Sequence, residues 1–317
     1  MRSYNTPLPN PFRMRSCKNT GWGRGYLTRD AQNFSLKAGS SLLPVNYRLS
    51  TINSSRLTPA ISAMPPHEVN FRRSAKRMSR VAAILPAAGL GTRMGAETPK
   101  QFLDLDGVPI VLYTLLRIAS CPLITAIYVA TRSDEVPRLE ERIRAEKFAQ
   151  AVRVLRGGDS RQASVAQALR EVPDSTEFVL VHDAVRPFVT REQIERVIAE
   201  ARRCQAAILG IPAMDTVKEV KRASLPEDVA LITATVPRER VVLAQTPQVF
   251  AMKLLKEAFA RAEQDGVTAS DEAGLVERLG HNVHVVLGSE RNIKITRPSD
   301  MDLARFYLDL ERERLKV

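Results

Sequence analysis

A glycine-containing stretch near residue 90 carries the residue types that bind phosphate groups. It reads PAAGLGTRMGAETPKQ over residues 86–101 and follows an apolar run that predicts a buried strand. Gly89 and Gly91 lack a Cβ atom, so the backbone can turn N–H groups toward phosphate oxygens. Arg93 adds a planar guanidinium fork, and Lys100 adds a mobile positive charge. The stretch therefore predicts a phosphate-binding loop after a strand.

The spacing of the glycines separates this loop from two common nucleotide-binding loops. Gly89, Gly91 and Gly95 do not match the GxGxxG dinucleotide motif, and the stretch lacks the four-residue gap and Lys-Ser or Lys-Thr pair of a Walker A loop. An ordinary turn would explain the glycines by themselves. It would not explain the arginine and lysine that follow them.

A second stretch, RGGDSRQASV over residues 156–165, also places glycines between a predicted strand and a predicted helix. At Gly158 and Asp159, a base or ribose could lie against the backbone. Ser160 or Ser164 could instead be no more than a helix cap. By itself, the stretch leaves both interpretations open.

A third stretch, HDAVRPF over residues 182–188, follows a run that predicts a buried strand. Ligands of open α/β sheets bind at the carboxyl ends of strands. Asp183 is therefore a candidate for Mg²⁺ or a sugar hydroxyl, and Arg186 for a phosphate. The alternative is a local salt bridge between the two. We interpret His182 as an ordinary core histidine.

Further polar residues lie beside predicted strand ends, and singly each is typical of a solvated surface: Asp215, Thr216, Lys218, Arg238, Thr246, Asn292 and Lys294. The three cysteines are too scattered to suggest a nucleophile, and no Ser-His-Asp order stands out. This pattern fits direct phosphoryl or nucleotidyl transfer, in which positioning and charge neutralisation provide most of the catalysis.

Strand and helix patterns alternate from Arg80 onward. Strands are predicted over residues 81–86, 124–131, 152–155, 178–182, 206–212 and 283–287. Helices are predicted over residues 109–120, 133–150, 160–171, 190–204, 252–264, 270–279 and 298–316. Short apolar strands separated by helices indicate an α/β fold, a Rossmann-like three-layer arrangement around a mostly parallel central sheet.

The alternation breaks at Asp215. Residues 216–220 and 229–236 predict two β segments joined by a polar turn, with no helix between them. Such an excursion exposes strand edges and apolar faces that need a partner. We expect a protruding β-arm over about 213–238 that joins two copies of the chain in a homodimer.

The positive charge of the chain lies almost entirely at its beginning. The chain has 317 residues and a net charge of +12, but residues 1–77 hold 13 basic and two acidic residues, against 34 and 33 in the remainder. The part of the chain after residue 77 is therefore nearly neutral. Nucleic-acid binding would need a basic patch on that part, so a nucleic-acid-binding protein is disfavoured. No apolar run is long enough for a membrane helix.

Residues 1–77 predict a disordered extension, separate from a domain over 78–317. The Arg- and Ser-rich composition is compatible with an organelle-targeting peptide or a genuine extension, but also with a misassigned start at Met78. Proline, asparagine and aromatic residues interrupt any amphipathic helix, which favours a wrong start or a dispensable tail over targeting. The few, unpaired cysteines favour a reducing compartment, and we expect a cytoplasmic protein.

Taken together, six motifs in order resemble one enzyme family. The loop over residues 86–101, joined to GGDSRQASV, VHDAVRP, DTVK, TVPRERVVLAQTPQVF and NIKITRP, closely resembles the 2-C-methyl-D-erythritol 4-phosphate cytidylyltransferases. The resemblance covers Ser79 to about Tyr307. It implies that CTP and the methylerythritol phosphate give the CDP-alcohol and pyrophosphate with Mg²⁺, in the non-mevalonate isoprenoid pathway.

The resemblance also assigns roles to residues at matching positions. Cytidine contacts fall on Ala87, Ala88, Gly158, Asp159 and Ser164. Triphosphate contacts fall on Gly89, Gly91, Arg93 and Lys100. Asp183 matches the family's aspartate near the ribose and the metal, and Arg186 matches the arginine of the same motif. Lys294 matches a lysine near the α-phosphate. Substrate contacts fall on Thr246 and on two arm residues that serve the partner subunit's site, Thr216 and Arg238.

One position departs from the family pattern and keeps a related activity open. Val185 stands where the family usually has alanine, and ribitol-5-phosphate cytidylyltransferases share this version of the motif. Lys218 and the Pro-Ala-Ala-Gly loop fit the methylerythritol enzyme better. A non-catalytic nucleotide-binding protein on the same fold is a third hypothesis, against which Arg93, Lys100 and Lys294 argue.

Overall fold

The computed structural model describes residues 80–89, 99–146, 148–222 and 228–314. The chain divides into two units after Val69, and every described residue belongs to the second unit, Asn70–Val317. The predicted extension over residues 1–77 and two predicted phosphate-loop residues, Gly91 and Arg93, lie outside the described residues.

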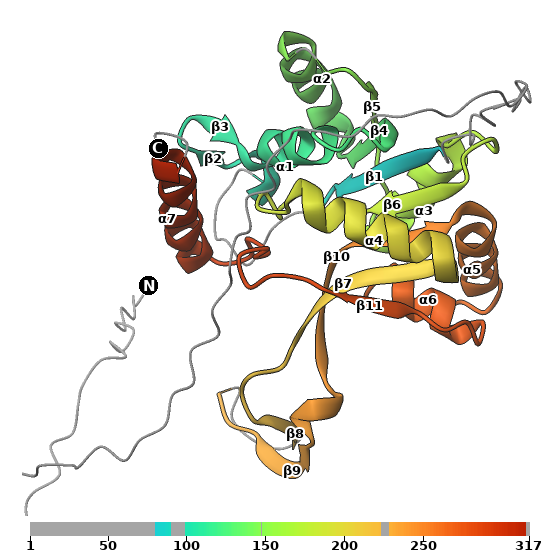
Figure 1. Ribbon diagram of the computed structural model, residues 1–317, viewed down its shortest axis with the longest axis vertical. Coiled ribbons are helices and arrows are strands. Elements are labelled where there is room, and N and C mark those ends of the chain that lie inside the picture. The colour runs from blue at the N-terminus through green and yellow to red at the C-terminus, as the bar shows by residue number, and fades with distance from the viewer. Residues whose placement is uncertain (1–79, 90–98, 147, 223–227, 315–317) are drawn as a thin grey trace, which may run out of the picture. The chain divides into compact units, whose positions relative to one another are not determined.

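A seven-stranded sheet forms the centre of this unit, in the order β11-β7-β10-β6-β1-β4-β5 (Figure 1). Its strands are β1 (Val81–Ala87), β4 (Ile124–Thr131), β5 (Ala151–Arg156), β6 (Phe178–Val181), β7 (Ala206–Pro212), β10 (Val242–Ala251) and β11 (His284–Leu287). All neighbouring pairs are parallel except those that involve β10, which runs antiparallel to β6 and β7. The predicted mostly parallel α/β fold is confirmed.

The sequence pattern did not predict strand β10. Proline cannot donate a ladder hydrogen bond and is therefore rare in a central strand. The pairing of β10 with β7 shifts register between Ala244 and Gln248, so Pro247 lies at an irregularity of the ladder. The strand therefore accommodates proline in the middle of the sheet.

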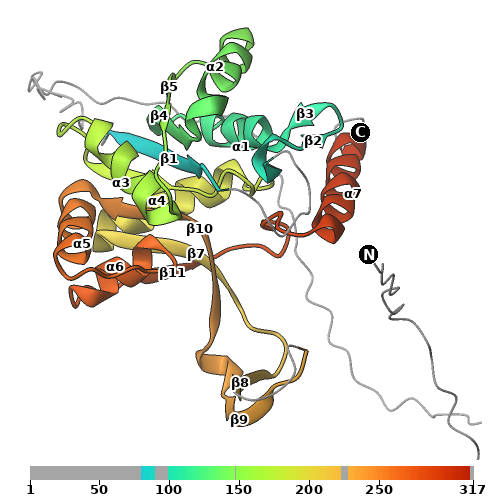
Figure 2. The ribbon, with the colours of Figure 1, turned by 180° about the vertical axis from the view of Figure 1, so that it is seen from behind.

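Helices cover both faces of the sheet, as Figures 1 and 2 show from opposite sides. One face packs against α1 (Ile110–Ala119) and α4 (Arg191–Cys204), and the other against α3 (Arg161–Glu171), α5 (Met252–Gln264) and α6 (Glu272–Arg278). Two further helices are α2 (Val136–Ala145) and α7 (Pro298–Arg314). Among the described residues, no helix combines the length and apolar character needed to cross a bilayer.

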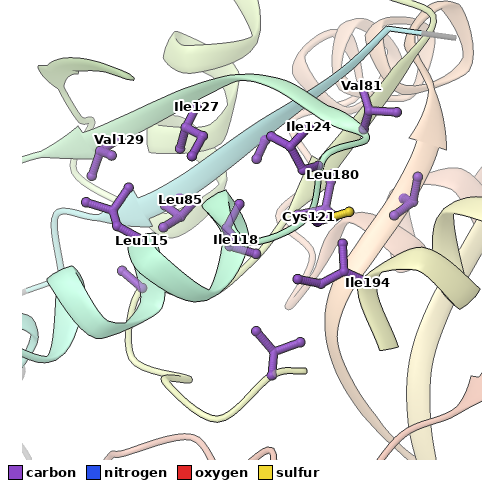
Figure 3. Packing of buried hydrophobic residues seen from close by; sticks show 14 of the residues in the cluster. Val81, Leu85, Leu115, Ile118, Cys121, Ile124, Ile127, Val129, Leu180 and Ile194 are labelled. Atoms are coloured by element: carbon purple, nitrogen blue, oxygen red, sulfur yellow. The ribbon is translucent and has the colours of Figure 1, made fainter. Parts of the chain in front are cut away.

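Strand β1 is buried on both faces, which explains its continuous apolar sequence. Val81, Ala83 and Leu85 belong to the core beneath α1 and α4, whereas Ala82 and Ile84 belong to the core beneath α3 and α5. Figure 3 shows the first of these cores, with apolar side chains of β1, β4 and β6 packed against those of α1 and α4. This central strand thus positions the loop that follows it.

The helix predicted over residues 133–150 is shorter in the structure. A 3₁₀ turn, Ser133–Glu135, precedes α2, which ends at Ala145. Leu139 is the only fully buried side chain of α2, so little apolar surface holds a longer helix in place. Gln150 donates a hydrogen bond from Nε2 to the carbonyl of Ala119 and lies in the loop before β5. In contrast, the predicted capping box of Thr190 and Gln193 at the start of α4 is confirmed.

Two small antiparallel sheets lie outside the central sheet. The short pair β2 (Asp104–Leu105) and β3 (Val108–Pro109) is joined by Asp106 and Gly107, both with positive φ, as a tight hairpin requires. The predicted β segments of the arm form β8 (Val217–Lys221) and β9 (Leu231–Val236), which project from β7 and β10 (Figures 1 and 2).

Adjacent leucines of α1 provide a test of the core. We expect Leu115→Ala to lower the free energy of unfolding by about 2–5 kcal/mol, because Leu115 is fully buried and its truncation leaves a cavity. Leu116 is 42% exposed, so Leu116→Ala should cost about 0.5 kcal/mol or less. Urea denaturation of both variants measures the difference, and equal losses would contradict the described packing.

Candidate active site

A cleft of about 230 Å³ lies at the carboxyl ends of β1 and β6. Its lining comprises Pro86, Ala87, Ala88, Gly89, Lys100, Gln101, Arg161, Ser164, Asp183, Ala184, Val185 and Lys294. Seven residues that were predicted from sequence are among them: Ala87, Ala88, Gly89, Lys100, Ser164, Asp183 and Lys294. A wider hollow of about 590 Å³ between α3 and α5 is lined by none of the predicted site residues.

The carboxylate of Asp183 is the centre of charge in this cleft. Its Oδ1 lies 3.0 Å from Nε of Arg161, and its Oδ2 lies 3.0 Å from Nζ of Lys294 and 3.4 Å from Nε of Arg186. Burial alone would raise the pKa of Asp183, but the positive charges of the three partners outweigh burial and hold it below its usual value. The carboxylate is therefore ionised.

Arg161 was not predicted as a site residue. Its Nη1 lies 2.7 Å from Oε1 of Glu272, whose side chain is 1% exposed, so one guanidinium joins two buried carboxylates. Burial raises the pKa of Glu272 despite this partner. Arg161 is the first residue of α3, directly after the cap Ser160, where a cation opposes the helix dipole. An arginine at the start of a predicted helix is unfavourable, and this position was the signal in the sequence that Arg161 has a role outside the helix.

A chain of hydrogen bonds connects β6 with β10 beneath the carboxylate. The backbone N–H of Asp183 donates to Oγ1 of Thr246 over 3.1 Å, and this hydroxyl lies 3.0 Å from Nδ1 of His182. Nε2 of His182 lies 3.1 Å from the carbonyl of Arg186, which can only accept, so Nδ1 is the acceptor for Thr246. Burial lowers the pKa of His182 to about 4. The predicted core histidine is confirmed, and it holds the Asp183 loop.

Gln101 holds the other wall of the cleft. Its buried side chain donates from Nε2 to the carbonyl of Ala87 over 2.5 Å and to that of Gly89 over 3.2 Å. These bonds fix the end of β1 where the predicted phosphate loop begins. No spacing rule in the sequence identified Gln101, because its partners are backbone atoms.

The loop after β5 packs closely against the loop after β1. A Cβ atom on Gly157 would lie 2.7 Å from Cβ of Ala88, and one on Gly158 would lie 2.6 Å from Cβ of Ala163, so both positions require glycine. Ser164 accepts from the N–H of Gly158 over 3.1 Å and donates to the carbonyl of its own helix start. Asp159 is exposed and does not line the cleft.

The segment after β11 is attached to the Asp183 loop. Arg186 donates from Nη1 to the carbonyl of Asn292 over 2.7 Å, and the N–H of Ile295 donates to the carbonyl of Val185 over 3.0 Å. These bonds carry Lys294 to the cleft. Arg186 itself is buried and does not line the cleft, and the local ion pair named as its alternative role is present.

The two predicted arm residues do not line this cleft. Thr216 and Arg238 are exposed, and Arg238 donates from Nη1 to the carbonyl of Met214 over 2.7 Å. Lys100, Arg161 and Lys294 do line it, and the last two pair with Asp183. Such a cleft suits an anionic ligand with several charges, because each cation offsets part of that charge in a partly dehydrated site.

Known proteins match this sequence and fold. A family model described as "IspD: 2-C-methyl-D-erythritol 4-phosphate cytidylyltransferase" matches residues 81–310. The 2-C-methyl-D-erythritol 4-phosphate cytidylyltransferase of Acidobacterium capsulatum is 52% identical over 235 residues, which cover 72% of this chain and 97% of that protein. The protein of the same name from Solibacter usitatus is 46% identical over 242 residues, with 74% and 98% covered.

Solved structures carry the same fold. The 4-diphosphocytidyl-2C-methyl-D-erythritol synthase of Anaerococcus prevotii has a TM-score of 0.63 and 28% identity, covering 73% of this chain and 99% of that chain. The 2-C-methyl-D-erythritol 4-phosphate cytidylyltransferase of Thermus thermophilus has a TM-score of 0.58 and 37% identity, with 72% and 98% covered. With the family model and these relatives matched over most of its length, the chain belongs to the 2-C-methyl-D-erythritol 4-phosphate cytidylyltransferase family.

Proposed function

We propose that this enzyme transfers CMP from CTP to 2-C-methyl-D-erythritol 4-phosphate, giving 4-diphosphocytidyl-2-C-methyl-D-erythritol and pyrophosphate. The reaction belongs to the non-mevalonate isoprenoid pathway. The observation that carries the proposal is the cleft that Lys100, Arg161 and Lys294 line together with the ionised Asp183. A triphosphate and a phosphate monoester together carry several negative charges, which these cations would offset.

The nucleoside half of CTP would lie between two loops. Ala87 and Ala88 line one side of the cleft, and Ser164 lines the other. Gly158 does not line the cleft, but its N–H donates to the hydroxyl of Ser164, and we assign to it a contact with the base. Backbone N–H and carbonyl groups can read the edge of a base without a dedicated side chain. Asp159 lies at the exposed rim of this place and would contact the base or ribose from outside.

The triphosphate half would lie over the loop that begins at Gly89. Lys100 lines the cleft on that side, and we assign to it the β- and γ-phosphates, together with Gly91 and Arg93. Lys294 lies on the Asp183 side and would contact the α-phosphate. Attack of the substrate phosphate on the α-phosphorus brings two anions together, so these cations would reduce repulsion and stabilise the departing pyrophosphate.

Mg²⁺ fits this cleft in the company of the nucleotide. Asp183 is the only carboxylate among the described lining residues, and three cationic side chains surround it. A lone divalent cation would meet net positive charge there, whereas phosphate oxygens would supply the remaining ligands that magnesium prefers. When bound, the ion would neutralise charge on the phosphates. We therefore propose Asp183 as its protein contact, with the metal arriving on CTP.

The arm would join two subunits in a homodimer. Leu231 and Ile232 are 61% and 58% exposed on β9, and Met214 is 71% exposed at the base of the arm. A pair of strands with apolar side chains in water needs a covering surface. A second copy would supply it, and Thr216 and Arg238 would then contact the substrate phosphate in the partner's cleft. Thr246 and Arg186 are buried beside the subunit's own cleft and would hold the Asp183 loop in place there.

The domain assignment and the cellular location follow the same reasoning. We assign residues 78–317 to the cytidylyltransferase domain and treat residues 1–77 as dispensable, because the family match begins at residue 81. We assign the enzyme to the cytoplasm, because its relatives named above are bacterial proteins of the same length as this domain. Nucleic acid and membrane are not among the proposed partners.

A coupled assay of pyrophosphate release tests the function. With CTP and Mg²⁺, 2-C-methyl-D-erythritol 4-phosphate should be turned over much faster than ribitol 5-phosphate, and a protein that starts at Met78 should match the full chain. We expect Lys100→Ala to reduce turnover by about 100-fold, the scale of losing one transition-state donor. The control Lys253→Ala removes an exposed lysine of α5 and should leave turnover unchanged. Faster turnover of ribitol 5-phosphate, or a Lys100→Ala enzyme within twofold of wild type, would refute the assignment.

A double-mutant cycle tests the bridge between the two carboxylates. Arg161→Ala should lower the free energy of unfolding by about 3–5 kcal/mol, because it leaves the buried charge of Glu272 without its partner. Glu272→Gln in the same protein should recover part of this loss, since the orphaned charge is gone. Chemical denaturation of the two single variants and the double variant measures the coupling, and strictly additive losses would contradict it.

Mixed dimers test the role of the arm. A 1:1 mixture of Lys100→Ala and Arg238→Ala subunits, refolded or exchanged together, should recover about one quarter of wild-type activity if each arm serves the partner's cleft, because half of the dimers then contain one intact site. If each arm served its own cleft, every site would lack one residue. The mixture would then be no more active than the two variants measured separately.

A further inference from the structure

A thiol, an imidazole and a carboxylate converge on the side of the sheet away from the catalytic cleft. A carboxylate oxygen of Glu200, the Sγ of Cys204 and a ring nitrogen of His284 all lie within 4.8 Å of one another. Glu200 and Cys204 are four residues apart on α4 and so share one helix face, and His284 begins the edge strand β11. The chain has three cysteines and four histidines, and one of each meets at a single carboxylate.

The geometry is close to that of a tridentate metal site. Nδ1 of His284 lies 2.7 Å from Oε1 of Glu200. Ligand atoms around a tetrahedral zinc ion are about 3.3–3.6 Å apart, given bonds of about 2.0–2.3 Å. Small side-chain rotations would thus open the Glu200–His284 pair and bring the sulfur in. The Sγ of Cys204 now contacts the carbonyls of Glu200 and Ala206, at 3.1 and 3.2 Å, and would exchange those contacts for a metal bond.

The surroundings of these side chains supply further features of a metal site. Arg203 lies 3.1 Å from Oε2 of Glu200, which leaves Oε1 directed at the imidazole. Outer partners of this kind orient the carboxylate ligands of metals. The three side chains are partly exposed, so a fourth position is open to water.

We propose that Glu200, Cys204 and His284 bind a borderline-soft divalent cation of the zinc class, distinct from the Mg²⁺ of catalysis. A thiolate and an imidazole select zinc over magnesium, which prefers oxygen ligands. The ion would attach the first residue of β11 to the last turns of α4. Because β11 is the edge strand of the described sheet, beside β7, and continues toward Lys294, the ion would stabilise an edge that leads into the catalytic cleft.

Calorimetric titration with ZnCl₂ and with MgCl₂ tests the site. All proteins should be full chains that carry Cys17→Ser and His67→Asn. These changes remove the one cysteine and the one histidine of residues 1–77, so that neither side chain can bind zinc in the titration. We expect one equivalent of zinc to bind and magnesium not to compete. Cys204→Ser and His284→Asn should each weaken zinc binding by at least about tenfold, the smallest loss caused by removing even an outer partner of a metal ligand.

The matched control is His281→Asn, which changes an exposed histidine three residues before His284 and should leave zinc affinity unchanged. Cobalt provides an independent readout, because a thiolate ligand gives Co²⁺ a near-ultraviolet charge-transfer band that Cys204→Ser should abolish. Melting curves without metal verify that each variant is folded. Wild-type zinc affinity in Cys204→Ser or His284→Asn, or a cobalt complex without the thiolate band, would overturn the proposal.

Discussion

The buried carboxylate of Asp183 constrains this structure more than any other group. Removing a carboxylate from water is costly unless opposite charges accompany it, and here burial is offset by Arg161, Lys294 and Arg186. The three cations come from the start of α3, from the segment after β11 and from the Asp183 loop itself. These parts of the chain must therefore be in place before the ionised carboxylate can be buried at low cost, which couples assembly of the fold to assembly of the cleft.

Strand β10 connects the two functional parts of the described unit. It leaves the arm after the short turn Arg238–Arg240 and passes through the middle of the sheet, where Thr246 lies beneath the Asp183 loop. Its antiparallel direction follows from this route, since the chain returns from the arm toward the amino ends of the neighbouring strands. Thr246 thus connects the strand that returns from the arm to the backbone of Asp183 by one hydrogen bond.

Two separate parts of the described unit carry the catalytic cleft and the proposed metal site. Carboxyl ends of β1 and β6 present the cleft, with its cations, while the edge strand β11 and helix α4 carry the thiol, imidazole and carboxylate of the proposed zinc-class site. The side chains at the two places differ, because phosphate groups and a zinc-class metal ion require different binding groups. Hard phosphate oxygens are met by ammonium and guanidinium groups, and a soft metal would be met by sulfur and nitrogen.

The sequence by itself determined the alternation of strands and helices, because burial on both faces leaves a local apolar pattern that can be recognised without neighbours. It also singled out Lys100 from the glycine-containing loop and Asp183 from the carboxyl end of a strand, whereas Lys294 was singly typical of a solvated surface and received its role only from the family resemblance. Only the tertiary structure decided that β10 enters the sheet, that Arg161 reaches Glu272 across 111 positions, and that Arg186 points to Asn292 rather than into the cleft. Those outcomes depend on pairings between distant segments, and local periodicity carries no record of them.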